Sequence, residues 1–329
     1  MRRRRRRGGA LAGRMLLPLA GGPCGGGHTM SRRIAFILNA TAGGGVDGEA
    51  FLAYRRRIDE IANGAPVAVV RTGEDIREQG RLALADACDA VVAAGGDGTL
   101  NAVASCLVGT SVVFGVLPFG TLNHFAQDAG IPLDIDAALD VIARGAVDTV
   151  DVGEIAGLHF LNNASLGLYV EVVRHRERQQ ARLGRGKWPA FAWALWSALR
   201  RFPFMALRIN IDGNESRIKT PFLFLGNNRY QMSGLQIGRR QSLQEGTLSI
   251  YLAQRAGRMR LFVLAFHALL GRLGSTHDFH EITAQRLQIS SRHATLRLAT
   301  DGEVAHAKTP LECRIHARAL KVYLPDKGN

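Results

Sequence analysis

The chain has 329 residues, 47% of them hydrophobic, which is enough for two ordinary globular domains with real cores. No apolar run reaches the roughly 18 residues of a bilayer-spanning helix, so the composition excludes an integral membrane protein of that kind. The formal net charge of +14 favours an anionic partner, although ordinary solubility charge is an equally good explanation.

Residues 1–30 are not expected to belong to a fold. They hold seven arginines (Arg2 to Arg7 and Arg14) and no acid, which leaves a charge of +7 for the rest of the chain. The apolar patch Met15–Ala20 is too short and interrupted for a secretory signal. Because a clean strand pattern follows Met30, we interpret residues 1–29 as a mis-assigned start or a disordered tail. A nucleic-acid-binding arm is the weaker alternative.

From Ile34 to about residue 147, strand patterns alternate with helical ones. Strands are expected at Ile34–Leu38, Val67–Arg71, Ala90–Ala94 and Val112–Leu117. Helices are expected across Phe51–Ile61, around Ile76–Ala85, over Thr99–Leu107 and from near His124. This alternation is typical of an α/β domain with an open parallel sheet and helices on both faces, which we assign to residues 31–147.

Each of these strands is followed by a polar or glycine-rich loop. The loops are Asn39–Gly45, Thr72–Gly73, Gly95–Asn101 and Gly120–Asn123. In parallel sheets of this kind, ligands bind beyond the carboxyl ends of the strands. The four loops are therefore predicted to meet at one binding site.

The turn Gly95-Gly96-Asp97-Gly98 lies between an expected strand and an expected helix, as in phosphate-binding sites. Glycine lets the backbone approach a ligand closely, and the free N–H groups at a helix start favour an anion. Asp97 is the only charge in the turn and is placed where a nucleotide phosphate or its metal would lie. An ordinary tight turn, with Asp97 capping the helix, is the alternative interpretation.

After about Val147 the pattern changes to strands with few helices, which predicts a mainly β domain over residues 148–329. Strands are expected at Asp148–Ile155, His159–Asn163, Leu207–Ile211, Phe222–Leu225, Leu248–Leu252, Leu287–Ser290 and Thr295–Leu298. Asp212-Gly213-Asn214 indicates a hairpin. Helical inserts are expected at Trp188–Phe202 and Arg258–Leu273. The aromatic stripe of the first suits a membrane interface, although such stripes more often face a protein core.

Six blocks of the sequence resemble the diacylglycerol kinase catalytic-domain family, especially its soluble bacterial lipid kinases, and more distantly sphingosine and ceramide kinases. In family order they are Asn39-Ala-Thr-Ala-Gly43, Gly95-Gly-Asp-Gly-Thr-Leu-Asn101, Pro118-Phe-Gly-Thr-Leu-Asn123, Asn162-Asn-Ala-Ser-Leu-Gly167, Gln244-Glu-Gly-Thr247 and Asp301-Gly-Glu303. NAD kinases share the glycine turn, and phosphofructokinases have a similar one. The later blocks, above all Asp301-Gly-Glu303, separate the families.

The resemblance implies a two-domain kinase that holds ATP and Mg²⁺ in the cleft between its domains. A return of the last strand to the first domain is left open. The resemblance places Gly95, Gly96, Asp97, Gly98 and Thr99 around the triphosphate. The rest of the nucleotide site would comprise Asn39, Gly43, Thr72, Gly120, Thr121 and Asn123. Asp97 would engage the Mg²⁺–phosphate unit, and either Asp301 or Glu303 would accept the proton of the lipid hydroxyl.

The chain departs from the family pattern at three places. His124 stands where bacterial members usually have Asp, and Asn39-Ala40 replaces the usual Asn-Pro. Glu245 replaces an Asp of a second, structural metal site, where it would act with the carbonyl groups of Ser242 and Thr247. Whether that second site exists is left open. His277 and His280 lack an evident third ligand, so we do not expect a metal there.

We therefore expect a lipid kinase of phospholipid metabolism that acts on a membrane lipid, with diacylglycerol as the expected acceptor. It would be cytoplasmic and in peripheral contact with the inner membrane leaflet, and the four scattered cysteines fit that reducing compartment. An NAD kinase-like enzyme with a soluble substrate and a non-catalytic lipid or nucleotide sensor remain alternatives. No nucleic-acid partner is expected, and a homodimer is left open.

Overall fold

The structure is a computed structural model, and it describes residues 32–42, 54, 56–61, 66–167, 204–211, 213–233, 236–240, 242–253 and 279–326. The predictions for residues 1–29, for Gly43 and for the two helical inserts lie outside the described residues, as do those for His277 and the side chain of His280. Among the described residues, no helix is long and apolar enough to cross a membrane.

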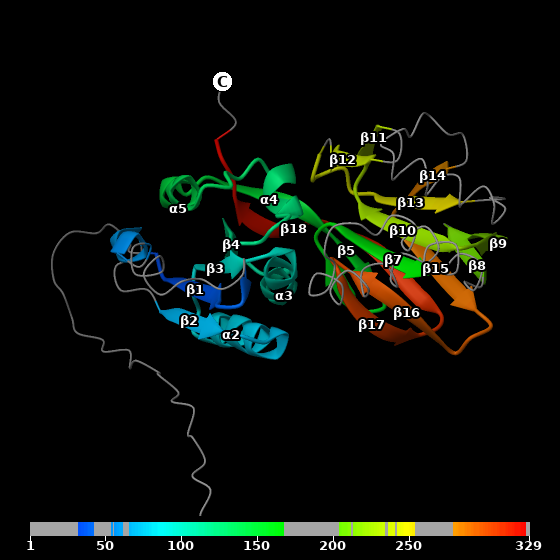
Figure 1. Cartoon of the computed structure of the whole chain (residues 1–329), viewed down its shortest axis with the longest axis horizontal. Helices are drawn as coiled ribbons and strands as arrows, with labels where there is room; N and C mark the ends of the chain where they lie inside the picture. The colour runs from blue at the N-terminus through cyan, green and yellow to red at the C-terminus, as the bar shows by residue number, and fades with distance from the viewer. Residues whose placement is uncertain are drawn as a thin grey trace, which may run out of the picture. The chain divides into compact units, whose positions relative to one another are not determined.

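The first half of the chain forms the predicted parallel sheet (Figure 1). Its strands are β1 (Ile34–Asn39), β2 (Val67–Val70), β3 (Ala90–Gly95) and β4 (Val113–Pro118), in the order β2-β1-β3-β4. All neighbouring pairs among them are parallel. Every residue of β3 is buried, as expected for a strand covered on both faces, and this explains its unbroken apolar run.

Helices follow strands β1 to β4 along the chain. They are α2 (Gly73–Ala85), α3 (Asp97–Leu107), α4 (His124–Asp128) and α5 (Ile135–Arg144), and residues 54 and 56–61 of the predicted first helix are helical. The prediction missed α5, although its sequence carries both end signals. Asp134 accepts a hydrogen bond from the N–H of Ala137, and Gly145 ends the helix with a positive φ of 72°.

The last strand joins the two halves of the chain in one sheet. β18 (Leu311–Tyr323) runs parallel to β4 at its end and antiparallel to β5 (Val147–Ile155) and β15 (Arg286–Ser291). The sheet then continues through β8 (Met205–Ile211) to β9 (Asn214–Thr220), and β6 (Leu158–Phe160) pairs with β5. Ile211 at the end of β8 pairs with Asn214 at the start of β9, so the predicted hairpin joins these two strands.

A second, antiparallel sheet packs against this extension. Its order is β14 (Phe279–Ala284), β13 (Leu248–Ala253), β10 (Phe222–Asn227), β7 (Asn163–Gly167), β16 (Thr295–Thr300) and β17 (Glu303–Lys308). β11 (Tyr230–Ser233) and β12 (Gln236–Arg240) form a separate pair. One apolar core contains Leu207 and Leu287 from the first sheet and Leu223 and Leu298 from the second. The predicted fold class, α/β followed by mainly β, is confirmed.

One predicted strand is in fact two. The expected strand His159–Asn163 is divided into β6, which ends at Phe160, and β7, which begins at Asn163. The backbone N–H groups of Leu161, Asn162 and Asn163 donate to the carboxylate of Asp301. This prediction was wrong because an apolar pattern cannot show that backbone donors are taken up by a distant side chain.

Candidate active site

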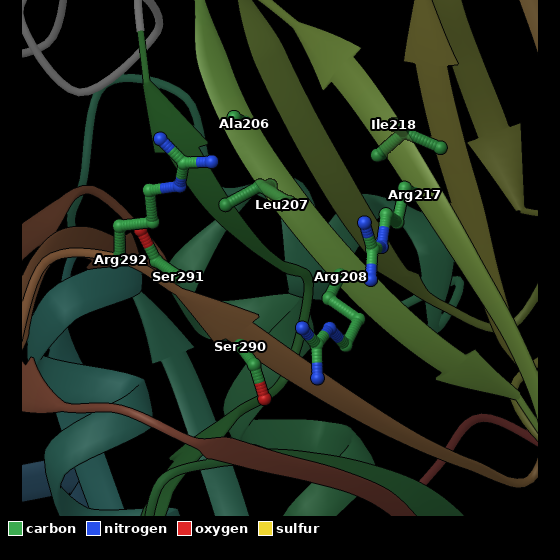
Figure 2. Close-up of a pocket in the computed structure, with 8 residues that line it drawn as sticks. All are labelled: Ala206, Leu207, Arg208, Arg217, Ile218, Ser290, Ser291 and Arg292. Carbon is green, nitrogen blue, oxygen red and sulfur yellow. The ribbon is translucent and has the colours of Figure 1, made fainter.

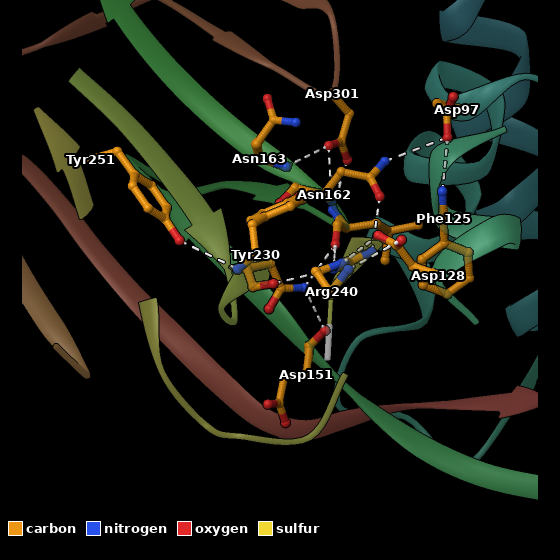
Figure 3. A network of polar contacts seen from close by, with 12 residues as sticks. Asp97, Phe125, Asp128, Asp151, Asn162, Asn163, Tyr230, Arg240, Tyr251 and Asp301 are labelled. Carbon is orange, nitrogen blue, oxygen red and sulfur yellow. Dashed lines mark hydrogen bonds and ion pairs between the residues drawn. The ribbon is translucent and has the colours of Figure 1, made fainter. Parts of the chain in front are cut away.

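The glycine turn after β3 leaves the start of α3 without a side-chain cap. Gly96 is the N-cap residue, and Asp97 is the first helical residue. Instead of capping α3, the Asp97 Oδ1 atom accepts the Phe125 N–H at 3.2 Å and the Asn162 side-chain amide at 3.5 Å (Figure 3). Free backbone donors at a helix start, with a carboxylate beside them, suit a phosphate and its metal ion.

A second turn, after β4, touches the first. A Cβ atom built on Gly120 would lie 2.5 Å from the Cα of Gly96 and 2.6 Å from Asn123 Oδ1, so only glycine permits this approach. Asn123 is left-handed, with a φ of 50°, and its side-chain amide donates to the carbonyl oxygens of Pro118 and Gly120. Its Oδ1 atom is buried and has no partner in the described part of the chain, which leaves an acceptor for a ligand or a water.

The other predicted nucleotide residues differ in how closely they join these turns. The Asn39 amide at the end of β1 donates to Thr99 Oγ1 at 2.8 Å and so ties β1 to α3. Thr72 follows β2 at the same edge of the sheet. It is the N-cap residue of α2, and its hydroxyl accepts the Asp75 N–H. Thr121 is exposed in the second turn. The carboxyl ends of the strands thus assemble most of the predicted set.

Asp301 and Gly302 form the two-residue turn between β16 and β17. Their φ angles of 45° and 88° are both positive, as a type I′ hairpin requires, and Thr300 pairs with Glu303 across the turn. The Asp301 carboxylate turns inward and accepts the N–H groups of Leu161 at 2.7 Å and of Asn162 and Asn163 at 2.9 Å (Figure 3). Asp301 is therefore both a residue of the hairpin turn and a member of the candidate site.

Burial and hydrogen bonding change the pKa of Asp301 in opposite directions. Burial, assisted by the negative charge of nearby Asp97, raises the pKa of Asp301 to about 6, while the three backbone N–H groups act to lower it. Asn162 donates to both carboxylates, from its backbone N–H to Asp301 at 2.9 Å and from its side-chain amide to Asp97 at 3.5 Å. The turn near the C-terminus thus meets the glycine turn.

Glu303 stands directly at the glycine turn. A Cβ atom built on Gly98 would lie 3.2 Å from Glu303 Oε1, and the other carboxylate oxygen lies 3.3 Å from Arg77 Nη2 of α2. Both side chains of this ion pair are 47% exposed, so it can rearrange at little cost. Unlike Asp301, Glu303 is therefore available to a substrate.

Asn162 connects the two halves of the site, and sequence reasoning gave it no role. Its backbone N–H binds Asp301, its amide binds Asp97, and its Oδ1 accepts Arg240 Nη2 at 3.0 Å. Arg240 is buried and pairs with Asp128 at 2.7 Å (Figure 3). Arg240 and Asp128 were missed because 112 residues separate them, and no local pattern marks such a pair.

A cleft of about 520 Å³ opens beside Glu303. It lies between helices α2 and α3 on one side and strands β6, β16 and β17 on the other. Its lining comprises Arg77, Arg81, Leu84, Asn101, Ala102, Ser105, Cys106, Gly157, Leu158, His159, Thr300, Glu303, Val304 and Ala305. Leu158 and Val304 are 37% and 39% exposed, so the cleft offers apolar surface next to the half-exposed carboxylate of Glu303.

The loop that contains Ser242, Glu245 and Thr247, the predicted ligands of a second metal, is held by the carboxylate of Asp151. Asp151 accepts the backbone N–H groups of Gly246 and Arg318, both at 2.7 Å. Glu245 is exposed, the Ser242 hydroxyl accepts the Gln244 N–H, and the Thr247 N–H donates to the Asn228 side chain. The metal set of Ser242, Glu245 and Thr247 stays a prediction.

A separate pocket contains none of the predicted site residues. It has a volume of about 310 Å³ and lies at β8, β9 and the end of β15 (Figure 2). Its lining comprises Ala206, Leu207, Arg208, Arg217, Ile218, Ser290, Ser291 and Arg292. It is therefore not part of the candidate active site.

Comparison with known proteins agrees with this geometry. The sequence model of the diacylglycerol kinase catalytic domain matches residues 33–155, and that of the YegS C-terminal NAD kinase beta sandwich-like domain matches residues 163–324. A diacylglycerol kinase of Mycobacterium tuberculosis (strain H37Rv) is 29% identical over 265 residues, which cover 77% of this chain and 82% of the relative.

Two further comparisons extend this result. A diacylglycerol kinase of Staphylococcus aureus (strain JH9) is 28% identical over 243 residues, which cover 72% of this chain and 75% of the relative. The crystal structure of a diacylglycerol kinase from Bacillus anthracis superposes with a TM-score of 0.64 at 19% identity and covers 91% of this chain and 99% of that one. At that identity the superposition shows the shared fold.

Proposed function

Because the chain belongs to the diacylglycerol kinase catalytic-domain family, we propose that it is an ATP-dependent lipid kinase that transfers the γ-phosphate to a hydroxyl of a membrane lipid, with diacylglycerol as the expected acceptor. The observation that carries the proposal is the meeting of two distant turns. Asn162 links Asp97 to Asp301, and Glu303 lies against Gly98. Phosphoryl transfer needs this juxtaposition of a phosphate cradle and a carboxylate.

The residues around the glycine turns fit ATP and Mg²⁺. The uncapped N–H groups of α3 and the bare backbone at Gly96 and Gly120 would hold phosphate oxygens, with Asn39 and Asn123 beside them. The Asp97 Oδ2 atom, which has no hydrogen bond within the described ranges, would take part in binding the cation. The bound Mg²⁺ would supply charge neutralisation to the transferred phosphate.

We assign different roles to the two carboxylates of the second turn. Glu303 would accept the proton of the attacking hydroxyl because its carboxylate is half-exposed, lines the cleft and, among the described residues, is held by Arg77 alone. Asp301 would act as a positioning residue because three backbone N–H groups already occupy its oxygens. It fixes Asn162, and through it the orientation of Asp97.

The cleft beside Glu303 favours a lipid over a soluble acceptor. Exposed Leu158 and Val304 line it, and a soluble dinucleotide would gain little from such apolar surface. We propose that the acceptor hydroxyl approaches Glu303 through this cleft while the protein rests peripherally on the inner leaflet of the membrane. An NAD kinase-like activity is the alternative that the experiment must distinguish.

The test uses purified full-length protein with Mg²⁺ and γ-labelled ATP. Three acceptors are compared: diacylglycerol in mixed micelles, a total bacterial lipid extract and NAD. Labelled phosphatidic acid from diacylglycerol supports the proposal. Labelled NADP without labelled lipid would favour the soluble alternative, and ATP binding without any labelled product would favour a non-catalytic sensor.

Two variants locate the chemistry. Glu303→Gln keeps the shape of the side chain but removes the proton acceptor, so we expect kcat to fall by at least about 100-fold with little change in ATP binding. Glu312→Gln is the matched control because Glu312 is an exposed β18 residue whose carboxylate accepts a hydrogen bond from Gln288. Equal activity of the Glu303→Gln variant and the wild type would refute the assigned role.

A further inference from the structure

Three metal-ligating side chains gather on neighbouring strands outside the proposed nucleotide site. Glu154 of β5 pairs directly with His159 of β6, and Arg314 of β18 pairs with Glu154 from the other side. His316 follows Arg314 by two residues and therefore projects from the same face of β18. Glu154 is buried, whereas the two imidazoles are half-buried and keep the cluster open on one side.

The ligand atoms of this cluster are close together. The Nε2 atom of His316 lies 2.6 Å from Glu154 Oε2, and the Nε2 atom of His159 lies 3.8 Å from the same oxygen. All three ligand atoms lie within 4.8 Å of one another. In a tetrahedral Zn²⁺ site with bonds of about 2.1 Å, ligand atoms are roughly 3.4 Å apart, so side-chain adjustments of about 1 Å would suffice.

A positively charged side chain already pairs with Glu154 and would compete with a bound cation. Arg314 donates to Glu154 Oε2 from Nε at 3.0 Å, its Nη2 atom lies 2.9 Å from the same oxygen, and its side chain is 55% exposed. Such an arginine can stay on the carboxylate as an outer hydrogen-bond partner or move aside into solvent. The competing explanation is a hydrogen-bonded network complete without a metal, and it is an explicit outcome of the test below.

We propose that Glu154, His159 and His316 form a binding site for a divalent transition-metal ion such as Zn²⁺, with water in the fourth position. Two imidazoles and one carboxylate are a ligand set that Zn²⁺ uses in proteins. Mg²⁺ is a poor occupant because it prefers oxygen ligands in octahedral geometry. The site is thus chemically distinct from the proposed Mg²⁺–ATP site.

The cluster is also connected to the candidate active site. His159 lines the 520 Å³ cleft, and its carbonyl oxygen accepts the Asn101 amide of α3 at 3.1 Å. After Phe160, β6 leads directly to the N–H groups of Leu161 and Asn162 that bind Asp301. A metal ion bound to His159 would therefore restrain β6, the strand that leads to the backbone N–H groups that bind Asp301.

Binding is tested directly, without relying on activity. Metal-free full-length protein is titrated with Co²⁺, whose tetrahedral complexes absorb strongly in the visible range, and Zn²⁺ is then added to displace it. The variants His159→Gln and His316→Gln remove one ligand each but keep a polar side chain that can donate to Glu154. His306→Gln is the matched control because His306 is an exposed histidine on β17, outside the cluster.

We expect wild type and His306→Gln to show the tetrahedral Co²⁺ spectrum with micromolar affinity. Each cluster variant should lose that spectrum or bind at least about 100-fold more weakly. The proposal is overturned if the wild type shows no tetrahedral band, or if the cluster variants bind as the control does. Circular dichroism checks folding, and if His316→Gln unfolds, His159→Gln carries the test, since His159 lies 3.8 Å from Glu154 and is not its close hydrogen-bond partner.

Discussion

The contact between the two glycine turns gives a sharp prediction for Gly120→Ala. The added Cβ would lie 2.5 Å from the Cα of Gly96 and 2.6 Å from Asn123 Oδ1. Neither neighbour is the free end of a flexible side chain, because Gly96 offers only backbone and the Asn123 amide is held by two carbonyl groups. The strain must therefore be relieved by moving one turn away from the other.

The size of that movement follows from the geometry. Ordinary van der Waals contact begins at about 3.4 Å, so the turns must separate by about 0.9 Å. Overpacking of this kind costs about 1–3 kcal/mol of stability, which a domain of ordinary stability survives. A misplacement of about 1 Å in a phosphate cradle costs about 100-fold in rate.

Steady-state kinase assays with labelled ATP measure the effect, and we expect kcat/KM for ATP to fall about 100-fold while the fold is retained. Gly109→Asn is the control. Gly109 follows the opposite end of α3, has a φ of 75° and has no atom within 4 Å of an added Cβ, so it tests backbone strain without displacing a turn. If Gly120→Ala turned over ATP like the wild type, the two turns would not jointly hold the nucleotide.

Three further predictions address the rest of the site. Burial raises the pKa of Asp301 to about 6 from an ordinary 3.8, so the folded state holds this proton more tightly than the unfolded state. The contribution of Asp301 to the free energy of unfolding is then largest below pH 3.8 and falls by up to about 3 kcal/mol as the pH rises through about 6. Urea unfolding between pH 3.8 and about 6 should show this decline in the free energy of unfolding for the wild type and not for Asp301→Asn. The prediction is contradicted if both proteins lose stability in parallel as the pH rises. Arg240→Met leaves Asp128 buried without its partner and should cost about 3–5 kcal/mol in the same assay; a loss below about 1 kcal/mol would show that the pair is dispensable. Leu158→Ser combined with Val304→Ser should raise KM for diacylglycerol in vesicles and leave KM for ATP unchanged, whereas an equal change in both would argue against an apolar acceptor cleft.

Local sequence was sufficient for the fold class and for the first four strands, whereas the site residues were carried over from the family resemblance and stay predictions. The buried strand before Gly95, the glycine turn and the Asp301-Gly302 hairpin are each set within a few residues, by apolar runs and by the conformational demands of a turn. Parallel strands place their carboxyl ends at one edge, so the meeting of the loops after β1, β3 and β4 also followed from the pattern. The helix α5, which was not predicted, has an N-cap at Asp134 and a C-cap at Gly145, so its sequence does carry the signals for both of its ends.

Tertiary structure alone decided how the site is held together. The Asp301 carboxylate reaches back to Leu161, 140 residues earlier, and breaks an apolar pattern into two strands there. The partnership of Arg240 with Asp128 and the position of β18 between β4 and β15 likewise had no local signature. Side-chain contacts of this kind depend on which surfaces the packed sheets bring together. A sequence read a few residues at a time specifies each turn and strand, but only their packing determines which carboxylate meets which backbone.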